Sequence, residues 1–158
     1  MMGRALLVVG LVATLGFTAA AVVGYRGLAG EGMQMHLLLA LVSSLLLLFS
    51  HCWIMFFLIG TGKAIKDAVA EHGLESELIA ETRRFKNSTF GWAMLAMGLA
   101  MATFILGGGV YTGAVPRWVH HALFYLALAA QAAALWRESR VLAANDRLMA
   151  GINRRLGG

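Results

Sequence analysis

Four long stretches without a charged side chain dominate this sequence, and they cover residues 5–24, 33–59, 89–108 and 119–136. A helix needs roughly 20 apolar residues to cross the ~30 Å hydrocarbon core of a bilayer. Four such spans joined by short links predict an all-α fold, an integral membrane four-helix bundle with antiparallel helices in up-down-up-down order. We expect residues 1–158 to form this single membrane domain.

The composition supports a membrane protein. Apolar residues make up 59% of the chain and charged residues only 13%, whereas soluble domains carry about 25% charged residues. A soluble domain of this size buries too little of its surface to hide so many apolar side chains. The single cysteine, Cys52, excludes an internal disulfide and a cysteine-based zinc cluster.

The basic residues are distributed unevenly between the two sides of the predicted bundle. If the spans alternate in direction, only Arg26 and Arg117 of the 13 Lys and Arg residues lie on the side away from the termini. Because Lys and Arg accumulate in cytoplasmic loops, we expect both termini in the cytoplasm, in a bacterial inner membrane. The same asymmetry explains the pI near 10.0, and nucleic-acid binding is not expected because no basic run is interleaved with aromatic residues.

Two segments are expected to lie outside the bilayer on the cytoplasmic side. The connector 60–88 is predicted to hold two short helices, 63–72, ended by Gly73, and 75–85. The tail 137–158 is predicted to continue the fourth span as an amphipathic helix, because its apolar residues recur at helical spacing.

A run of three glycines, Gly107–Gly109, follows the third span. We interpret it as the end of that span. A phosphate-binding loop would need a strand before it and a Lys-Ser or Lys-Thr pair after it, and the sequence predicts neither. Pro116 is expected near the start of the fourth span.

Polar side chains on the second span form one stripe. At ~100° per residue, His36, Ser43, Ser50 and His51 fall on the same side of the helix, and such a stripe should face the bundle interior. His36 and His51 are about 22 Å apart along the axis, so His36 is expected near the outer surface and His51 in the inner half. No acidic or lysine side chain lies within any predicted span, which argues against a carboxylate proton relay.

Two consecutive histidines, His120 and His121, begin the fourth span at the predicted depth of His36. Because consecutive helical residues point ~100° apart, only one of them can face His36 squarely. His120 shares a face with Gln131, the only strongly polar side chain deep in this span. We therefore expect His120 to face His36 and His121 to be an interface contact.

Paired imidazoles in a membrane bundle favour a bound cofactor. Imidazole ligates haem iron, copper and zinc, and two histidines from facing helices are the natural axial pair of a b-type haem. We expect haem b, with copper as the alternative. The candidate cofactor-binding and metal-ligating residues are His36, His51, His120 and His121.

His51 has no histidine partner at its expected depth. Its predicted neighbours are Met94 and Met97 on the third span and Leu135 on the fourth. A second site there would have to be a His–Met or a five-coordinate haem. Cys52 points ~100° away from His51 and is expected to face lipid or a neighbouring helix.

These features predict a small membrane b-type cytochrome that transfers electrons or senses redox state with a redox partner. The alternative is a non-catalytic membrane subunit or homo-oligomeric helper, whose Ala- and Gly-rich faces pack against other chains. The sequence contains no zincin, nucleophile-elbow or Walker motif. Whether the chain is an enzyme stays open.

Overall fold

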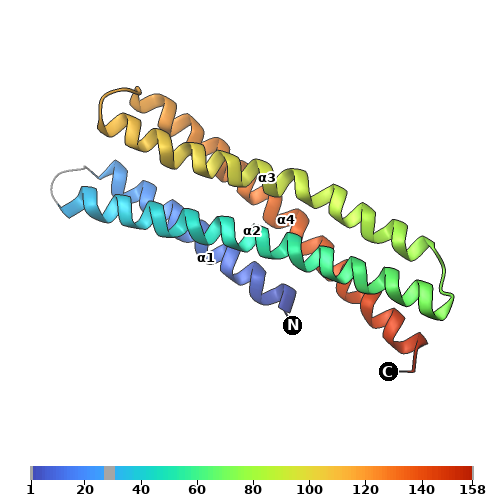
Figure 1. The fold of residues 1–158 in the computed structure, drawn as a ribbon. Coiled ribbons are helices and arrows are strands. Elements are labelled where there is room, and N and C mark those ends of the chain that lie inside the picture. The colour runs from blue at the N-terminus through green and yellow to red at the C-terminus, as the bar shows by residue number, and fades with distance from the viewer. Residues whose placement is uncertain (1, 27–30, 158) are drawn as a thin grey trace.

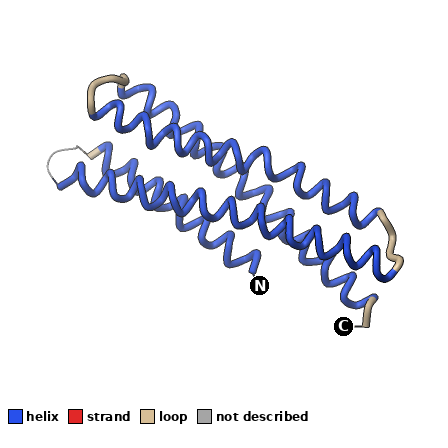
Figure 2. Tube along the Cα trace, in the orientation of Figure 1, coloured by secondary structure: helices blue, strands red, loops and turns tan. Residues whose placement is uncertain are grey.

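The computed structural model describes residues 2–26 and 31–157, and these residues form four helices (Figures 1 and 2). The helices are α1 (Met2–Tyr25), α2 (Glu31–His72), α3 (Glu77–Tyr111) and α4 (Arg117–Arg155). No strand occurs among the described residues. The predicted all-α fold with four helices is therefore confirmed.

Each helix contains a stretch long and apolar enough to cross a membrane. Between 28% and 33% of each such stretch is buried inside the protein. The rest points outward and includes large apolar side chains such as Leu15, Phe56 and Ile105. A surface this apolar suits contact with lipid and not with water.

Helices α2 and α3 are longer than predicted, with 42 and 35 residues. Helix α4, with 39 residues, continues the fourth span into the tail as predicted. The prediction of two separate connector helices is wrong, because residues 63–72 continue α2 and most of 75–85 belongs to α3. The chain reverses within residues 73–76, where Gly73 adopts φ 62°, a left-handed conformation that suits glycine. At 1.5 Å per residue α2 is about 63 Å long, so it extends well beyond a hydrocarbon core.

The three glycines do not end the third helix, because α3 continues through Gly107–Gly109 to Tyr111. Gly107 and Gly109 allow close packing, whereas a Cβ on Gly108 would meet nothing within 4 Å. A Cβ atom on Gly109 would lie only 2.7 Å from Val115 Cγ2, so the turn that follows needs a glycine there. Pro116 precedes α4 directly, as predicted.

Each helix folds back along the one before it (Figure 1). Helix α1 packs against α2, α2 against α3, and α3 against α4, while α4 also contacts α1 and meets α2 across the bundle. Buried alanines, which include Ala96, Ala130 and Ala134, allow α3 and α4 to approach closely.

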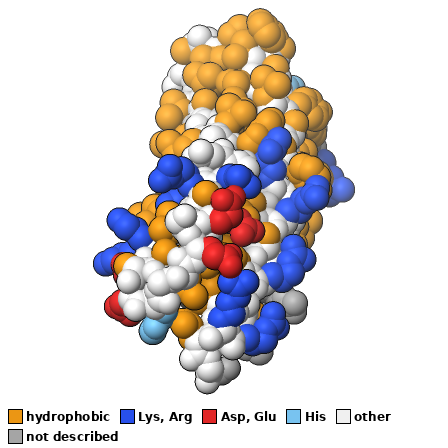
Figure 3. Space-filling model, turned by 90° about the vertical axis from the view of Figure 1, so that its right-hand side faces the viewer, with side chains coloured by type: hydrophobic (Ala, Val, Ile, Leu, Met, Phe, Trp, Pro, Cys, Tyr) orange, Lys and Arg blue, Asp and Glu red, His pale blue; other side chains and the backbone are white. Residues whose placement is uncertain are grey.

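The two ends of the bundle differ in charge. Lys and Arg side chains gather around the end that carries the α2–α3 turn, whereas the surface beyond them is apolar (Figure 3). We call this basic end the α2–α3 end, and we call the opposite end, which carries the turn at 112–116, the α3–α4 end.

Candidate functional site

Two polar sites lie inside the bundle at different depths. The first, here called the histidine pocket, is a cavity near the α3–α4 end that holds His36 and His120. The second, here called the buried network, consists of Thr14, His51, Gln131 and Glu138.

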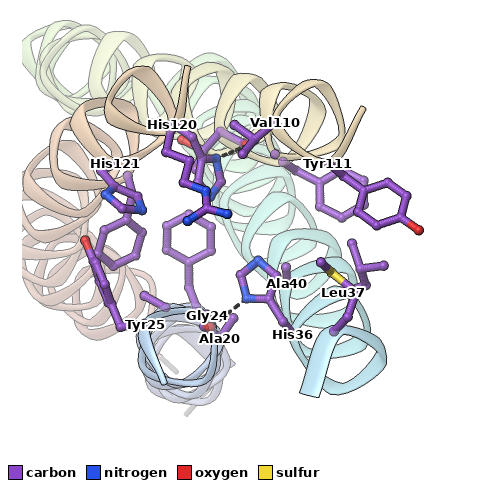
Figure 4. A pocket seen from close by; sticks show the side chains of 18 residues that line it. Ala20, Gly24, Tyr25, His36, Leu37, Ala40, Val110, Tyr111, His120 and His121 are labelled. Atoms are coloured by element: carbon purple, nitrogen blue, oxygen red, sulfur yellow. Dashed lines mark hydrogen bonds between the residues drawn. The ribbon is translucent and has the colours of Figure 1, made fainter. Parts of the chain in front are cut away.

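The histidine pocket has a volume of about 530 Å³ and is lined by residues from all four helices (Figure 4). Aromatic and small side chains make up most of its wall, among them Phe17, Phe104, Phe124, Ala40, Gly24 and Gly107. The basic side chains that line it are His36, Arg117, His120 and His121. A mostly apolar cavity of this size with a few convergent polar groups is typical of a cofactor or ligand site.

The His36 ring is held by the backbone of α1. Its Nδ1 lies 2.7 Å from the carbonyl oxygen of Ala20, and because a carbonyl can only accept, Nδ1 must carry the hydrogen. In the neutral imidazole Nε2 is then left with a free lone pair. Gly24 makes room for the ring, since a Cβ there would lie 3.0 Å from His36 Cε1 and Nδ1.

The His120 ring is held by α3 in the same manner. Its Nδ1 lies 3.0 Å from the carbonyl oxygen of Thr103, so Nδ1 is the donor and Nε2 is again free to ligate. A Cβ on Gly107 would lie 3.0 Å from His120 Cε1. Each histidine therefore sits over a glycine and bonds to the carbonyl four residues before that glycine.

The structure brings His36 and His120 together and leaves His121 aside. The ring centroids of His36 and His120 are 6.5 Å apart and their planes stand at 81°. His121 packs against Tyr25, with ring centroids 4.9 Å apart (Figure 4). His120, and not His121, therefore lies beside His36, while the expected contact of His121 with the membrane interface stays a prediction.

His51 lies in the buried network, away from the histidine pocket. It is fully buried, its Nδ1 is 2.6 Å from Glu138 Oε1, and its Nε2 is 2.7 Å from Gln131 Oε1. Both ring nitrogens are thus engaged, and His51 presents no free nitrogen to a metal. Of the two methionines expected nearby, Met94 is exposed and Met97 places its sulfur 3.7 Å from Cys52 Sγ.

Glu138 is the functional candidate that the sequence reasoning missed. The fourth span was predicted to end at Trp136, so Glu138 was assigned to the cytoplasmic tail, yet its side chain is fully buried beside His51. The spacing of polar residues along the fourth span could have indicated that Glu138 is buried. Glu138 follows Gln131 by seven residues and therefore shares its helix face, which was already expected to point inward.

An apolar layer separates the two sites. Ala13 and Phe17 of α1, Leu47 of α2, Met97 and Ala100 of α3, and Phe124 and Ala127 of α4 form one buried cluster. Phe17 and Phe124 also belong to the wall of the pocket, whereas Leu47 on α2 and Ala127 on α4 lie between the pocket residues and the network residues of their helices.

Among residues 2–26 and 31–157, no group of three or more His, Cys, Asp and Glu side chains is placed to hold a metal ion. The histidine pocket therefore offers two nitrogen ligands from the protein, and not a complete coordination shell of its own. Searches of protein-family models, curated proteins and solved structures found no match to this chain.

Proposed function

We propose that this protein is a small membrane b-type cytochrome that binds haem b between His36 and His120 and serves electron transfer or redox sensing. The observation that carries the proposal is the pair of imidazoles on one cavity, each with Nδ1 bonded to a backbone carbonyl and Nε2 free. Histidines that ligate metals commonly donate their other N–H to a carbonyl, which fixes the ring and its tautomer.

The separation of the two rings suits a shared iron atom. Two imidazoles that each bind one metal at about 2 Å hold their ring centroids roughly 6 Å apart, and the observed separation is 6.5 Å. Haem supplies its own four equatorial nitrogens, so it needs from the protein only the two axial ligands that the pocket offers. Copper, the alternative, would find fewer nitrogen ligands here than it usually takes.

The walls of the pocket also favour haem. The cavity of about 530 Å³ is bounded by phenylalanines and small residues, which suits a flat apolar macrocycle. Arg117 lines the same cavity and its side chain is exposed, so its guanidinium is available at the pocket mouth to pair with a carboxylate such as a haem propionate.

The charge pattern supports a membrane orientation. Eleven of the 13 basic residues belong to the N-terminal start or to the α2–α3 end, whereas Arg26 and Arg117 belong to the opposite end. By the positive-inside rule both termini are cytoplasmic and the histidine pocket is near the outer surface of a bacterial inner membrane. An electron carrier at this depth would meet a partner at that surface.

Absorption spectra of the purified protein test the proposal. We expect a Soret band and reduced-minus-oxidised bands of b-type haem in the wild type, and their loss in His36→Ala and in His120→Ala. His121→Ala is the matched control, because it removes an adjacent histidine whose ring packs on Tyr25, and it should keep the spectrum.

A colourless preparation without iron would contradict the proposal. Copper found in stoichiometric amount, and lost in the same two variants, would favour the copper alternative. Co-purification with a larger complex that is indifferent to all three histidine changes would favour a non-catalytic membrane subunit.

A further inference from the structure

The buried network forms an unbroken chain of hydrogen bonds across three helices. Gln131 Nε2 of α4 lies 3.1 Å from Thr14 Oγ1 of α1, and the other end of the same amide contacts His51 of α2. His51 in turn contacts Glu138 of α4. His51 and Glu138 are both fully buried, and Gln131 is 1% exposed.

Hydrogen-bonding rules decide where most of the protons lie. Thr14 donates its hydroxyl hydrogen to the carbonyl of Gly10 at 2.7 Å, so it must accept from the amide nitrogen of Gln131. The amide oxygen of Gln131 therefore faces His51, and because it can only accept, His51 Nε2 carries a hydrogen. The remaining contact, Nδ1 to Glu138 Oε1 at 2.6 Å, must then contain one shared proton between two basic atoms.

The second carboxylate oxygen of Glu138 is open to a further proton. Oε2 is buried and has no hydrogen-bond partner, and an unsatisfied buried polar atom is rare and asks for an explanation. With one shared proton the pair is neutral. A proton that arrives at Oε2 leaves the shared proton on Nδ1, so the pair becomes an imidazolium beside a carboxylic acid with one positive charge.

A line of polar side chains leads from Glu138 to the α2–α3 end along α3. Arg137 of α4 lies over Trp92 of α3, so Thr89, three residues before Trp92, lies within one turn of Glu138 on the side of the α2–α3 end, and Thr89 Oγ1 is also buried without a partner. Thr82 shares its face of α3 with Thr89. A Cβ on Gly62 would lie 3.6 Å from both Thr82 Oγ1 and Lys86 Nζ, so these two side chains converge there.

Among the described residues, few titratable side chains lie on the helices at the depth of the pair. The sequence of α1 carries no titratable side chain from Ala5 to Gly24, and that of α3 carries none from Thr89 to Val110. Cys52 on α2 turns to Met97, and Arg137 on α4 lies over the Trp92 ring at 4.8 Å from its centroid. Lys86 of α3, which is half-buried, is the nearest basic residue along the polar line.

We propose that His51 and Glu138 form a proton-binding site that takes up one proton from the α2–α3 end of the bundle. Water between Glu138 Oε2, Thr89 and the Thr82–Lys86 group would carry the proton, because buried polar atoms without protein partners are where internal water binds. The apolar layer of Phe17, Leu47 and Phe124 closes the site toward the histidine pocket. This proposal holds whether or not the pocket binds haem.

Infrared spectroscopy of the full protein in lipid vesicles tests proton binding directly. We expect acid-minus-neutral difference spectra to contain a band change in the carboxylic-acid C=O region that disappears in Glu138→Gln. If that variant does not fold, Glu138→Asp keeps the carboxyl group and should shift the band instead. Spectra identical in the wild type and in a folded Glu138 variant would overturn the proposal.

Deuterium exchange tests the route. After mixing with D₂O, the Glu138 band of the wild type should shift, and in Thr89→Val this shift should slow by about tenfold, since one hydrogen-bonding step is lost. Ser88→Ala is the matched control, because its hydroxyl bonds to Phe85 O and points ~100° away from Thr89. Equal exchange rates in Thr89→Val and Ser88→Ala would refute entry along α3.

Discussion

At the scale of single residues, the two histidines of the pocket depend on glycines in the neighbouring helix. In an α-helix each Cβ points toward the N-terminus and covers the turn before it. A glycine at position 24 or 107 therefore uncovers the carbonyl of Ala20 or Thr103, and the imidazole reaches that carbonyl through the gap. Because this arrangement occurs in both helix pairs, Nε2 is the ring nitrogen without a hydrogen bond to the backbone in both histidines.

Gly107→Val tests this dependence. A Cβ there would lie 3.0 Å from His120 Cε1, so the branched side chain must displace the ring and break its bond to Thr103. We expect the variant to lose its axial ligand and with it most of the haem absorbance per protein. Gly98→Val on the same helix is the control, because a Cβ at Gly98 meets nothing within 4 Å, and full absorbance in Gly107→Val would disprove the role given to the glycine.

At the scale of the helices, α2, α3 and α4 extend past the apolar spans, and they share a small core of their own. Ile65, Leu78 and Ile152 are buried together, one from each helix. This extension packs separately from the core clusters nearer the pocket. A local change here should therefore loosen the α2–α3 end without reaching the histidine pocket.

Ile65→Ala should show such local loosening. Ile65 is 1% exposed, and Ile→Ala at a buried site costs about 2–5 kcal/mol, so we expect faster proteolysis in the turn at 73–76 and faster amide exchange nearby. The haem spectrum should stay unchanged. Lys66→Ala, an exposed neighbour, controls for the loss of a long side chain, and a changed haem spectrum in Ile65→Ala would show that the extension and the pocket unfold as one unit.

At the scale of the whole molecule, the two polar sites lie one after the other along the bundle axis. The helices α2 and α4 keep a nearly constant register, since His36 meets His120 near one end and Thr61 donates to Asn145 near the other. His36 and His51 are about 22 Å apart along α2. An electron in the pocket and a proton in the network would therefore attract each other across the apolar layer.

This attraction predicts a pH-dependent midpoint potential in the haem-loaded protein. Two unit charges about 22 Å apart at an effective dielectric constant of about 20 interact by about 0.8 kcal/mol, which corresponds to about 30 mV for one electron. Because reduction favours proton uptake, the midpoint should fall by about this amount as the pH rises through the titration of the pair. Redox titrations should find the shift in the wild type and in Ser88→Ala but not in Glu138→Gln, and a pH-independent wild-type midpoint would show that the two sites do not communicate.

The number and positions of the apolar spans followed from the sequence alone, because local composition decides whether a segment can cross a bilayer. The polar stripe on the second span was also predicted from the sequence, and Ser43, Ser50 and His51 are buried as expected. The choice of His120 over His121 followed from the spacing to Gln131, since helical periodicity assigns residues to faces before any partner is known.

Tertiary structure decided what those faces meet. Charge-free windows placed Glu138 outside the membrane, whereas the packing of α2 against α4 buries it beside His51, where a hydrogen-bonded partner offsets the cost of removing a carboxyl group from water. The glycines at 107–109 looked like a helix end because glycine is a poor helix former. The structure shows the ring of His120 from α4 close to Gly107 of α3, and this approach between distant segments arises only when the helices pack.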